Sequence, residues 1–72
     1  MELFYIIAGA ESAAARKAAL ASGKDVRFRN LHYPEVRADF EARGGKVAPA
    51  LWDGEKLHEG LEAILKALGA RQ

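Results

Sequence analysis

The residues of this chain best placed to do chemistry lie between Tyr5 and Lys17, in the stretch Y-I-I-A-G-A-E-S-A-A-A-R-K. An apolar run, a small-residue turn and a helix-forming segment follow one another there. In α/β proteins such a junction often binds ligands, because the carboxyl end of a strand meets the positive end of a helix. The hydroxyls near this turn belong to Tyr5 and Ser12, and alanine fills most other positions. The junction can accept an anionic or extended ligand, but it lacks a strong nucleophile.

The composition removes several kinds of chemistry. The chain has no cysteine, which excludes disulfides, thiolate catalysis and cysteine-based metal sites. His32 and His58 lie far apart without a neighbouring acidic ligand pattern, so no metal site is predicted. The formal net charge is +1 with acids and bases interspersed, which argues against nucleic acid or an anionic membrane as partner. With no bilayer-spanning run and no signal-peptide pattern at the start, we expect a soluble, cytoplasmic protein.

The elements that position these residues begin with a strand and a helix. We expect a single domain over residues 1–72. The continuous apolar run at 3–8 predicts a strand that is covered on both faces. Residues 11–22 are strong helix formers, and Gly23 predicts the end of that helix.

A second strand and helix follow. Residues 26–31 alternate between apolar and basic types, which predicts an edge strand with two arginines on its solvent face. The apolar positions are Val26 and Phe28, and the basic ones are Arg27 and Arg29. Pro34 predicts the first turn of a helix that buries Val36 and Phe40. The pair Gly44-Gly45 predicts its end.

The last third predicts a hairpin and a helix. Residues 49–52 and 55–57 flank Asp53-Gly54, which favours a β-hairpin with a two-residue turn. The apolar stripe of the last helix is formed by Leu61, Ile64, Leu65 and Leu68, with Gly69 at its end. The predicted order is β-α-β-α-β-β-α, in which the first two strands are parallel and the hairpin strands antiparallel. The fold class is therefore α/β, with a four-stranded mixed sheet and three helices on its two faces.

This order, with a proline opening the third strand, resembles the thioredoxin fold in its minimal glutaredoxin form. Residues 46–54, K-V-A-P-A-L-W-D-G, resemble the K-V-P-A-L-x-D-G segment of glutaredoxins and glutathione transferase N-terminal domains. Residues 57–64, L-H-E-G-L-E-A-I, resemble the transferase run L-x-E-S-x-A-I, and residues 12–17, S-A-A-A-R-K, are similar to the transferase S-P-x-x-R-K helix start. Since a transferase would continue into a helical second domain, a stand-alone glutaredoxin-like domain is the closer match.

The chain departs from this family at the active loop. Glutaredoxins carry C-x-x-C or C-x-x-S there, and the helix start lowers the pKa of the first thiol. One alignment puts Ala10 and Ala13 at the two cysteine positions, and another puts Ser12 and Ala15 there. Neither supplies a thiol, so thiol–disulfide exchange is excluded for this sequence.

The resemblance implies a ligand site around Pro49. It implies a cis Ala48–Pro49 bond, an isomer found in about 5–6% of X-Pro bonds. The backbone at Val47 and Ala48 would then face a bound peptide or glutathione, which pairs with it like an extra strand. The resemblance also implies that Glu59 and Gly60 hold the γ-glutamyl end of glutathione, although the family's serine is glycine here. Plainer interpretations stay open, because a proline can simply begin a strand and every helix start needs such residues.

Three functions follow as hypotheses. The first is a redox-inactive, non-enzymatic glutaredoxin-like domain that binds a peptide, a thiol ligand or a partner protein along the groove beside Pro49, close to the Ala10 loop. The second is a glutathione-binding or transferase-like protein that uses the hydroxyl of Ser12 or Tyr5, although a helix-start serine and a core tyrosine are the plainer interpretations. The third is a cysteine-replaced form of a thiol–disulfide oxidoreductase. Glutathione is the one cofactor considered, and a monomer or weak dimer is expected.

Overall fold

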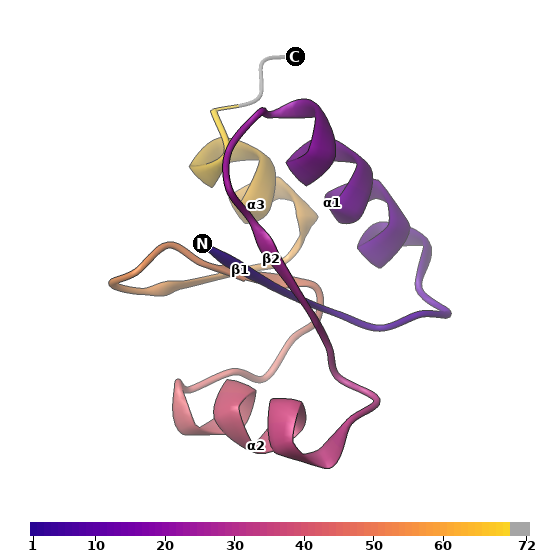
Figure 1. Cartoon of the computed structure of the whole chain (residues 1–72), viewed down its shortest axis with the longest axis vertical. Helices are drawn as coiled ribbons and strands as arrows, with labels where there is room; N and C mark the ends of the chain where they lie inside the picture. The colour runs from indigo at the N-terminus through magenta and orange to yellow at the C-terminus, as the bar shows by residue number, and fades with distance from the viewer. Residues whose placement is uncertain (70–72) are drawn as a thin grey trace.

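The computed structural model describes residues 1–69 and has the predicted order of strands and helices (Figure 1). The elements are β1 (Glu2–Tyr5), α1 (Ala10–Ala21), β2 (Arg27–Asn30), α2 (Pro34–Ala42), β3 (Ala50–Trp52), β4 (Leu57–Glu59) and α3 (Leu61–Ala67). The α/β class, the four-stranded mixed sheet and the three helices are confirmed. The predicted domain of residues 1–72 extends three residues beyond the described part. Within residues 1–69, none of the helices is long and apolar enough to cross a membrane.

The sheet has the strand order β2-β1-β3-β4. β1 runs parallel to β2, as a helical crossover between them requires, whereas β3 is antiparallel to both β1 and β4. In this register Leu3 lies opposite Phe28 on one side and Leu51 on the other. β2 and β4 are the two edge strands, which confirms the edge position predicted for residues 26–31.

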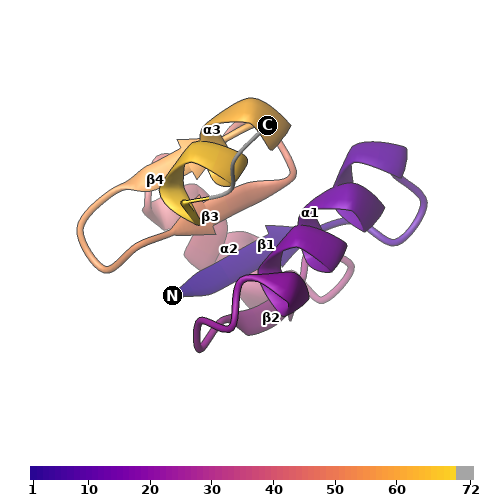
Figure 2. The ribbon, with the colours of Figure 1, turned by 90° about the horizontal axis from the view of Figure 1, so that it is seen from above.

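The helices lie on opposite faces of the sheet. Figure 1 shows α1 and α3 on one side and α2 on the other, and Figure 2 shows α1 and α3 over the sheet with α2 behind it. Because side chains alternate along a strand, β1 sends Leu3 to the first face and Phe4 to the second. The first cluster contains Leu3, Ala15, Ala19, Leu51, Ile64 and Leu68, and the second contains Phe4, Leu31, Val36, Phe40 and Ala50. Pro34 begins α2, and the predicted burial of Val36 and Phe40 is confirmed.

The first strand is shorter than predicted. It ends at Tyr5, and the expectation of a strand over 3–8 with both faces covered is wrong for its second half. Ile6 is 38% exposed and Ile7 is 67% exposed. The pairing of β1 with β3 ends at Phe4 opposite Ala50, so the chain beyond Tyr5 has no strand partner on that side. The apolar run therefore continues into an exposed loop.

The hairpin turn lies one residue later than predicted. The Asp53 N–H donates to the Lys56 carbonyl at 3.2 Å, so Gly54 and Glu55 occupy the centre of the turn. The Asp53 carboxylate accepts hydrogen bonds from the N–H groups of Glu55 and Lys56, at 2.8 and 2.9 Å. Asp53 therefore stabilises the turn from its first position, where an Asx turn needs the carboxylate, and the predicted Asp53-Gly54 centre is wrong.

Arg29 does not lie on a solvent face as predicted. It forms ion pairs with Glu2 and Asp39, and Arg43 at the end of α2 pairs with the same two carboxylates. The guanidinium carbons of Arg29 and Arg43 both lie 5.5 Å from the centre of the Phe4 ring. Burial opposes ionisation of Glu2, but the hydrogen bonds from Arg43 and Arg29 outweigh it and lower the pKa of this carboxyl. The network attaches α2 to the sheet.

Candidate functional site

Pro49 lies directly before β3, and a hydrogen bond connects it to Gly60, which lies directly before α3. The Ala48–Pro49 peptide bond is cis, as expected from the sequence. The Pro49 side chain is fully buried, and its carbonyl accepts a hydrogen bond from the Gly60 N–H at 2.9 Å. Ala48 packs against the buried cluster between the sheet and α2. The segment that leads into the proline thus has a fixed position at one end of the sheet.

Glu59 holds the other end of this segment. Its Oε1 accepts hydrogen bonds from the N–H groups of Lys46 and Val47, at 2.6 and 2.7 Å. These two bonds lower the pKa of the Glu59 carboxyl, because they stabilise its charged form. Glu59 and the Gly60 N–H, both predicted to hold the γ-glutamyl end of glutathione, are therefore engaged with the loop at 46–49.

The backbone of Ala48 differs from its surroundings. Among residues 1–69, no hydrogen bond uses its N–H or its carbonyl, whereas Lys46, Val47 and Pro49 on either side are all tied to Glu59 or Gly60. The Val47 side chain beside it is mostly exposed. A donor and an acceptor without partners thus lie on one residue of a segment that is otherwise fixed.

Because Glu59 acts as a carboxylate, its contribution should depend on pH. We expect Glu59→Gln to lower the free energy of unfolding at neutral pH by about 1 kcal/mol, since charge-assisted hydrogen bonds are lost at a partly exposed site. A carboxyl whose folded pKa lies below its unfolded pKa stabilises the fold above the unfolded value and loses this effect as pH falls through the folded value. The difference between wild type and variant should therefore shrink below a pH of about 4.

Urea denaturation at neutral pH and at a pH of about 3 measures this effect. Glu62→Gln, on the exposed side of α3, is the matched control and should change stability by a few tenths of a kcal/mol. A difference between wild type and Glu59→Gln that is the same at both pH values would contradict the role assigned to the carboxylate.

Ser12 is a buried structural residue. It lies in the first turn of α1 with no exposed surface, and its hydroxyl accepts a hydrogen bond from the Ile6 N–H at 3.1 Å. This bond fixes the loop between β1 and α1 against the helix. The predicted ligand contact by Ser12 would require a hydroxyl at the surface. The helix-start interpretation does not describe it either, because Gly9 is the N-cap of α1 and no side chain caps this helix.

Ser12→Ala should lower the free energy of unfolding by about 1–3 kcal/mol, because it leaves the Ile6 N–H without a partner next to a buried site. Urea denaturation measures the loss, and faster amide hydrogen exchange at Ile6 would locate it. Ala13→Ser, at the neighbouring exposed helix position, measures the intrinsic difference between alanine and serine in this helix. Unchanged exchange at Ile6 in Ser12→Ala would show that the hydroxyl does not fix the loop.

The two alignments of the active loop differ in exposure. Ala10 and Ala13 lie exposed at the start of α1, whereas Ser12 and Ala15 are fully buried. A pair of groups that react with an external partner must be accessible to it. Of the two alignments, the one with Ala10 and Ala13 puts both positions at the surface, and neither side chain carries a reactive group.

Tyr5 packs on the same face of the sheet as α1. Its ring meets Phe28 edge to face with centroids 6.2 Å apart, and the guanidinium carbon of Arg16 lies 5.1 Å from its centre. These contacts give Tyr5 a packing role between α1 and the edge strand β2.

His58 and Asp53 form a pair on the hairpin. The Nε2 atom of His58 lies 2.7 Å from Oδ2 of Asp53. This contact, together with the N–H groups of Lys56 and Glu55, holds the pKa of Asp53 well below its ordinary value. In the part of the chain that the structure describes, no three His, Asp or Glu side chains gather as a metal site would require.

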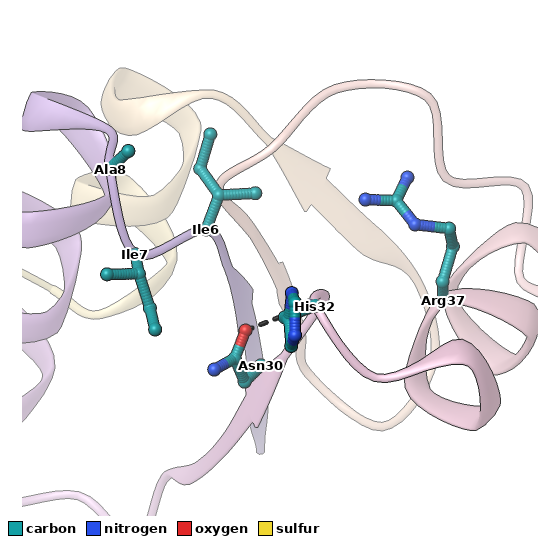
Figure 3. A pocket seen from close by; sticks show the side chains of 6 residues that line it. All are labelled: Ile6, Ile7, Ala8, Asn30, His32 and Arg37. Atoms are coloured by element: carbon teal, nitrogen blue, oxygen red, sulfur yellow. Dashed lines mark hydrogen bonds between the residues drawn. The ribbon is translucent and has the colours of Figure 1, made fainter.

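A hollow of about 270 Å³ lies where the parallel strands β1 and β2 end (Figure 3). Its lining residues are Ile6, Ile7, Ala8, Asn30, His32 and Arg37. The side-chain Oδ1 of Asn30 accepts a hydrogen bond from the His32 N–H at 2.9 Å, which fixes the turn after β2. Pro49 is not among the lining residues, so the groove predicted beside it and this hollow are separate features.

Sequence reasoning missed this hollow. No motif contains Arg37 or Asn30, His32 is considered only as a metal ligand, and the strand predicted over 3–8 includes Ile6 and Ile7. One signal was available, because parallel strands end at the same edge of a sheet. The residues that follow β1 and β2 must therefore lie close together.

The fold and the site together define an α/β domain with a mixed sheet, a fixed segment before a cis-proline and a hollow at the ends of two parallel strands. No protein-family model, curated protein sequence or solved structure matches this chain.

Proposed function

We propose that the chain is a thioredoxin-fold domain of the glutaredoxin type that has no redox activity and binds an extended peptide segment of a partner protein beside Pro49. The order of elements, the strand order and the cis-proline at the start of β3 are compatible with that fold. The absence of cysteine removes thiol–disulfide exchange but leaves recognition of an extended chain intact. The observation that carries the proposal is the unpartnered backbone of Ala48.

An extended peptide would pair with Ala48 as a strand pairs with a sheet edge. One residue of the peptide would accept from the Ala48 N–H and donate to its carbonyl, which are the two bonds of a β-ladder position. Glu59 and Gly60 already hold the protein segment on either side of Ala48. This segment therefore loses little conformational entropy of its own when a peptide binds.

Binding of glutathione through the transferase-type contacts is the competing function. Against it stands the engagement of Glu59 and the Gly60 N–H inside the chain. The Ser12 hydroxyl is likewise buried and bound to the Ile6 N–H, so it is not exposed to a thiolate. Within the described residues, the N–H and the carbonyl of Ala48 remain without partners, and the backbone of an extended peptide can bind to both.

Residue-resolved NMR titrations test the proposal. The probes are acetylated hexapeptides with alternating polar and aliphatic residues, and reduced glutathione. We expect the peptides to shift the Ala48 amide signal at concentrations of up to about 1 mM, where weak binding is measurable. The same peptides with an N-methyl group on the central amide cannot donate to the Ala48 carbonyl and should bind at least about tenfold more weakly.

Two outcomes would overturn the proposal. One is that no unmodified peptide shifts the signals of residues 47–49. The other is that glutathione shifts them whereas the peptides do not, which would favour the glutathione-binding function.

A further inference from the structure

The hollow at the ends of β1 and β2 has an apolar side and a polar side. Ile6, Ile7 and Ala8 form one side, and Arg37 from α2 lies across from them, with Asn30 and His32 in between (Figure 3). The apolar side comes from the loop that the structure leaves exposed after β1. Such a site suits a ligand that has an aliphatic part and an acceptor group close together.

Arg37 gives this hollow an unpaired positive charge. No ion pair or side-chain hydrogen bond involves Arg37 within residues 1–69, unlike Arg29 and Arg43, which share two carboxylates. In Figure 3 its guanidinium extends from α2 back toward Ile6. No carboxylate lines the hollow, so a ligand carboxylate would pair with Arg37 without competing with a carboxylate of the chain.

Ile6, which lines the hollow, directly follows the strand that pairs with β3. Phe4 is the last residue of β1 that pairs with β3, and its partner is Ala50. The pairing itself stops there, but the two chains continue from this pair, β1 toward Ile6 and β3 back toward Ala48, so the two segments leave the sheet at the same end. Ile6 is also part of the hollow, so a peptide beside Ala48 can reach into it.

We propose that this hollow binds the C-terminal residue of the partner peptide, with its aliphatic side chain against Ile6 and Ile7 and its carboxylate on Arg37. The inference rests on the proposed peptide-binding function and specifies which end of the peptide is recognised. One aliphatic C-terminal residue supplies both the apolar side chain and the carboxylate, which matches the two sides of the hollow. A C-terminal glycine lacks the side chain, and an internal acidic residue offers a carboxylate without an aliphatic branch.

Four acetylated hexapeptides of otherwise equal sequence test this inference, with dissociation constants measured by NMR titration. They end in leucine with a free carboxylate, in leucine with an amide, in glycine with a free carboxylate, or in an amide with glutamate at the fifth position. We expect the leucine acid to bind at least about tenfold more tightly than each of the other three.

Matched variants locate the two contacts. Arg37→Gln should remove the preference for the free carboxylate, whereas Arg27→Gln, at an exposed arginine of β2, should keep it. Ile7→Ala should remove most of the preference for leucine over glycine, and Leu20→Ala, at an exposed leucine of α1, should leave it unchanged.

The outcomes separate this inference from the proposed function. If all four peptides shift the Ala48 amide and bind with equal affinity, C-terminal recognition is overturned and strand pairing stands. If the peptide with the internal glutamate binds as tightly as the leucine acid, the protein recognises a side-chain carboxylate equally well and the C-terminal assignment is wrong. If no peptide binds, both proposals fail.

Discussion

Leu51→Ala is expected to lower the free energy of unfolding by about 2–5 kcal/mol, the usual cost of a cavity at a buried leucine. Leu51 has no exposed surface and lies on the central strand β3, where it packs in the cluster under α1 and α3. A chain of 72 residues is expected to have a total stability of about 4–11 kcal/mol, so this loss is a large part of the whole. Urea denaturation followed by circular dichroism measures it.

Leu20→Ala is the matched control for this prediction. Leu20 lies near the end of α1 and is 73% exposed, so the same truncation there should cost less than about 0.5 kcal/mol. Equal losses in the two variants would mean that the cluster under α1 and α3 does not hold the sheet.

Gly45→Ala should destabilise the fold by about 2–3 kcal/mol, near the upper end for an overpacked core. A Cβ atom at this position would lie 2.5 Å from Cε1 and 2.6 Å from Cδ1 of the Phe40 ring. That ring is nearly fully buried and packs against Phe4 with centroids 5.3 Å apart, so it has little room to move. The change should also displace Lys46 and Val47, because Gly45 directly precedes the segment that Glu59 holds.

Gly44→Ala separates this close contact from backbone strain. Gly44 has φ = +85°, and no atom lies within 4 Å of the position of its Cβ. Its substitution should therefore cost about 1 kcal/mol, the penalty of a left-handed conformation. Denaturation gives both values, and NMR shifts of the Phe40 ring should appear in Gly45→Ala alone. A larger loss in Gly44→Ala would contradict the importance of the Phe40 contact.

The two glycines also mark the limits of sequence reasoning about this fold. The pair Gly44-Gly45 predicted the end of a helix, and α2 does end at Ala42. Only the first glycine has the conformation that this pattern requires. The second is needed because a phenylalanine five residues earlier lies against its backbone, and no local pattern reveals such a contact.

The sequence predicts the candidate site around Pro49. What the site residues do, however, depends on hydrogen-bond partners that lie far from them in the sequence. The cis bond followed from the motif, whereas the engagement of Glu59 with Lys46 and Val47 depends on the position of β4 beside the loop. Ser12 illustrates the same point, because a serine at a helix start is compatible with both a surface cap and a buried hydroxyl. The exposure of the site residues was thus set by tertiary packing.

The sequence by itself determined the order of strands and helices, the mixed sheet and the absence of thiol chemistry. These features depend on periodicity, turn residues and composition, which are local properties of the chain. Tertiary structure decided where β1 stops, since Ile6 and Ile7 are as apolar as the residues before them and become exposed only because β3 begins at Ala50. Tertiary structure also placed Arg37 across from these two residues (Figure 3). The packing of α2 on the sheet sets the distance between Arg37 and the two isoleucines, so that the charged side chain lies opposite apolar ones.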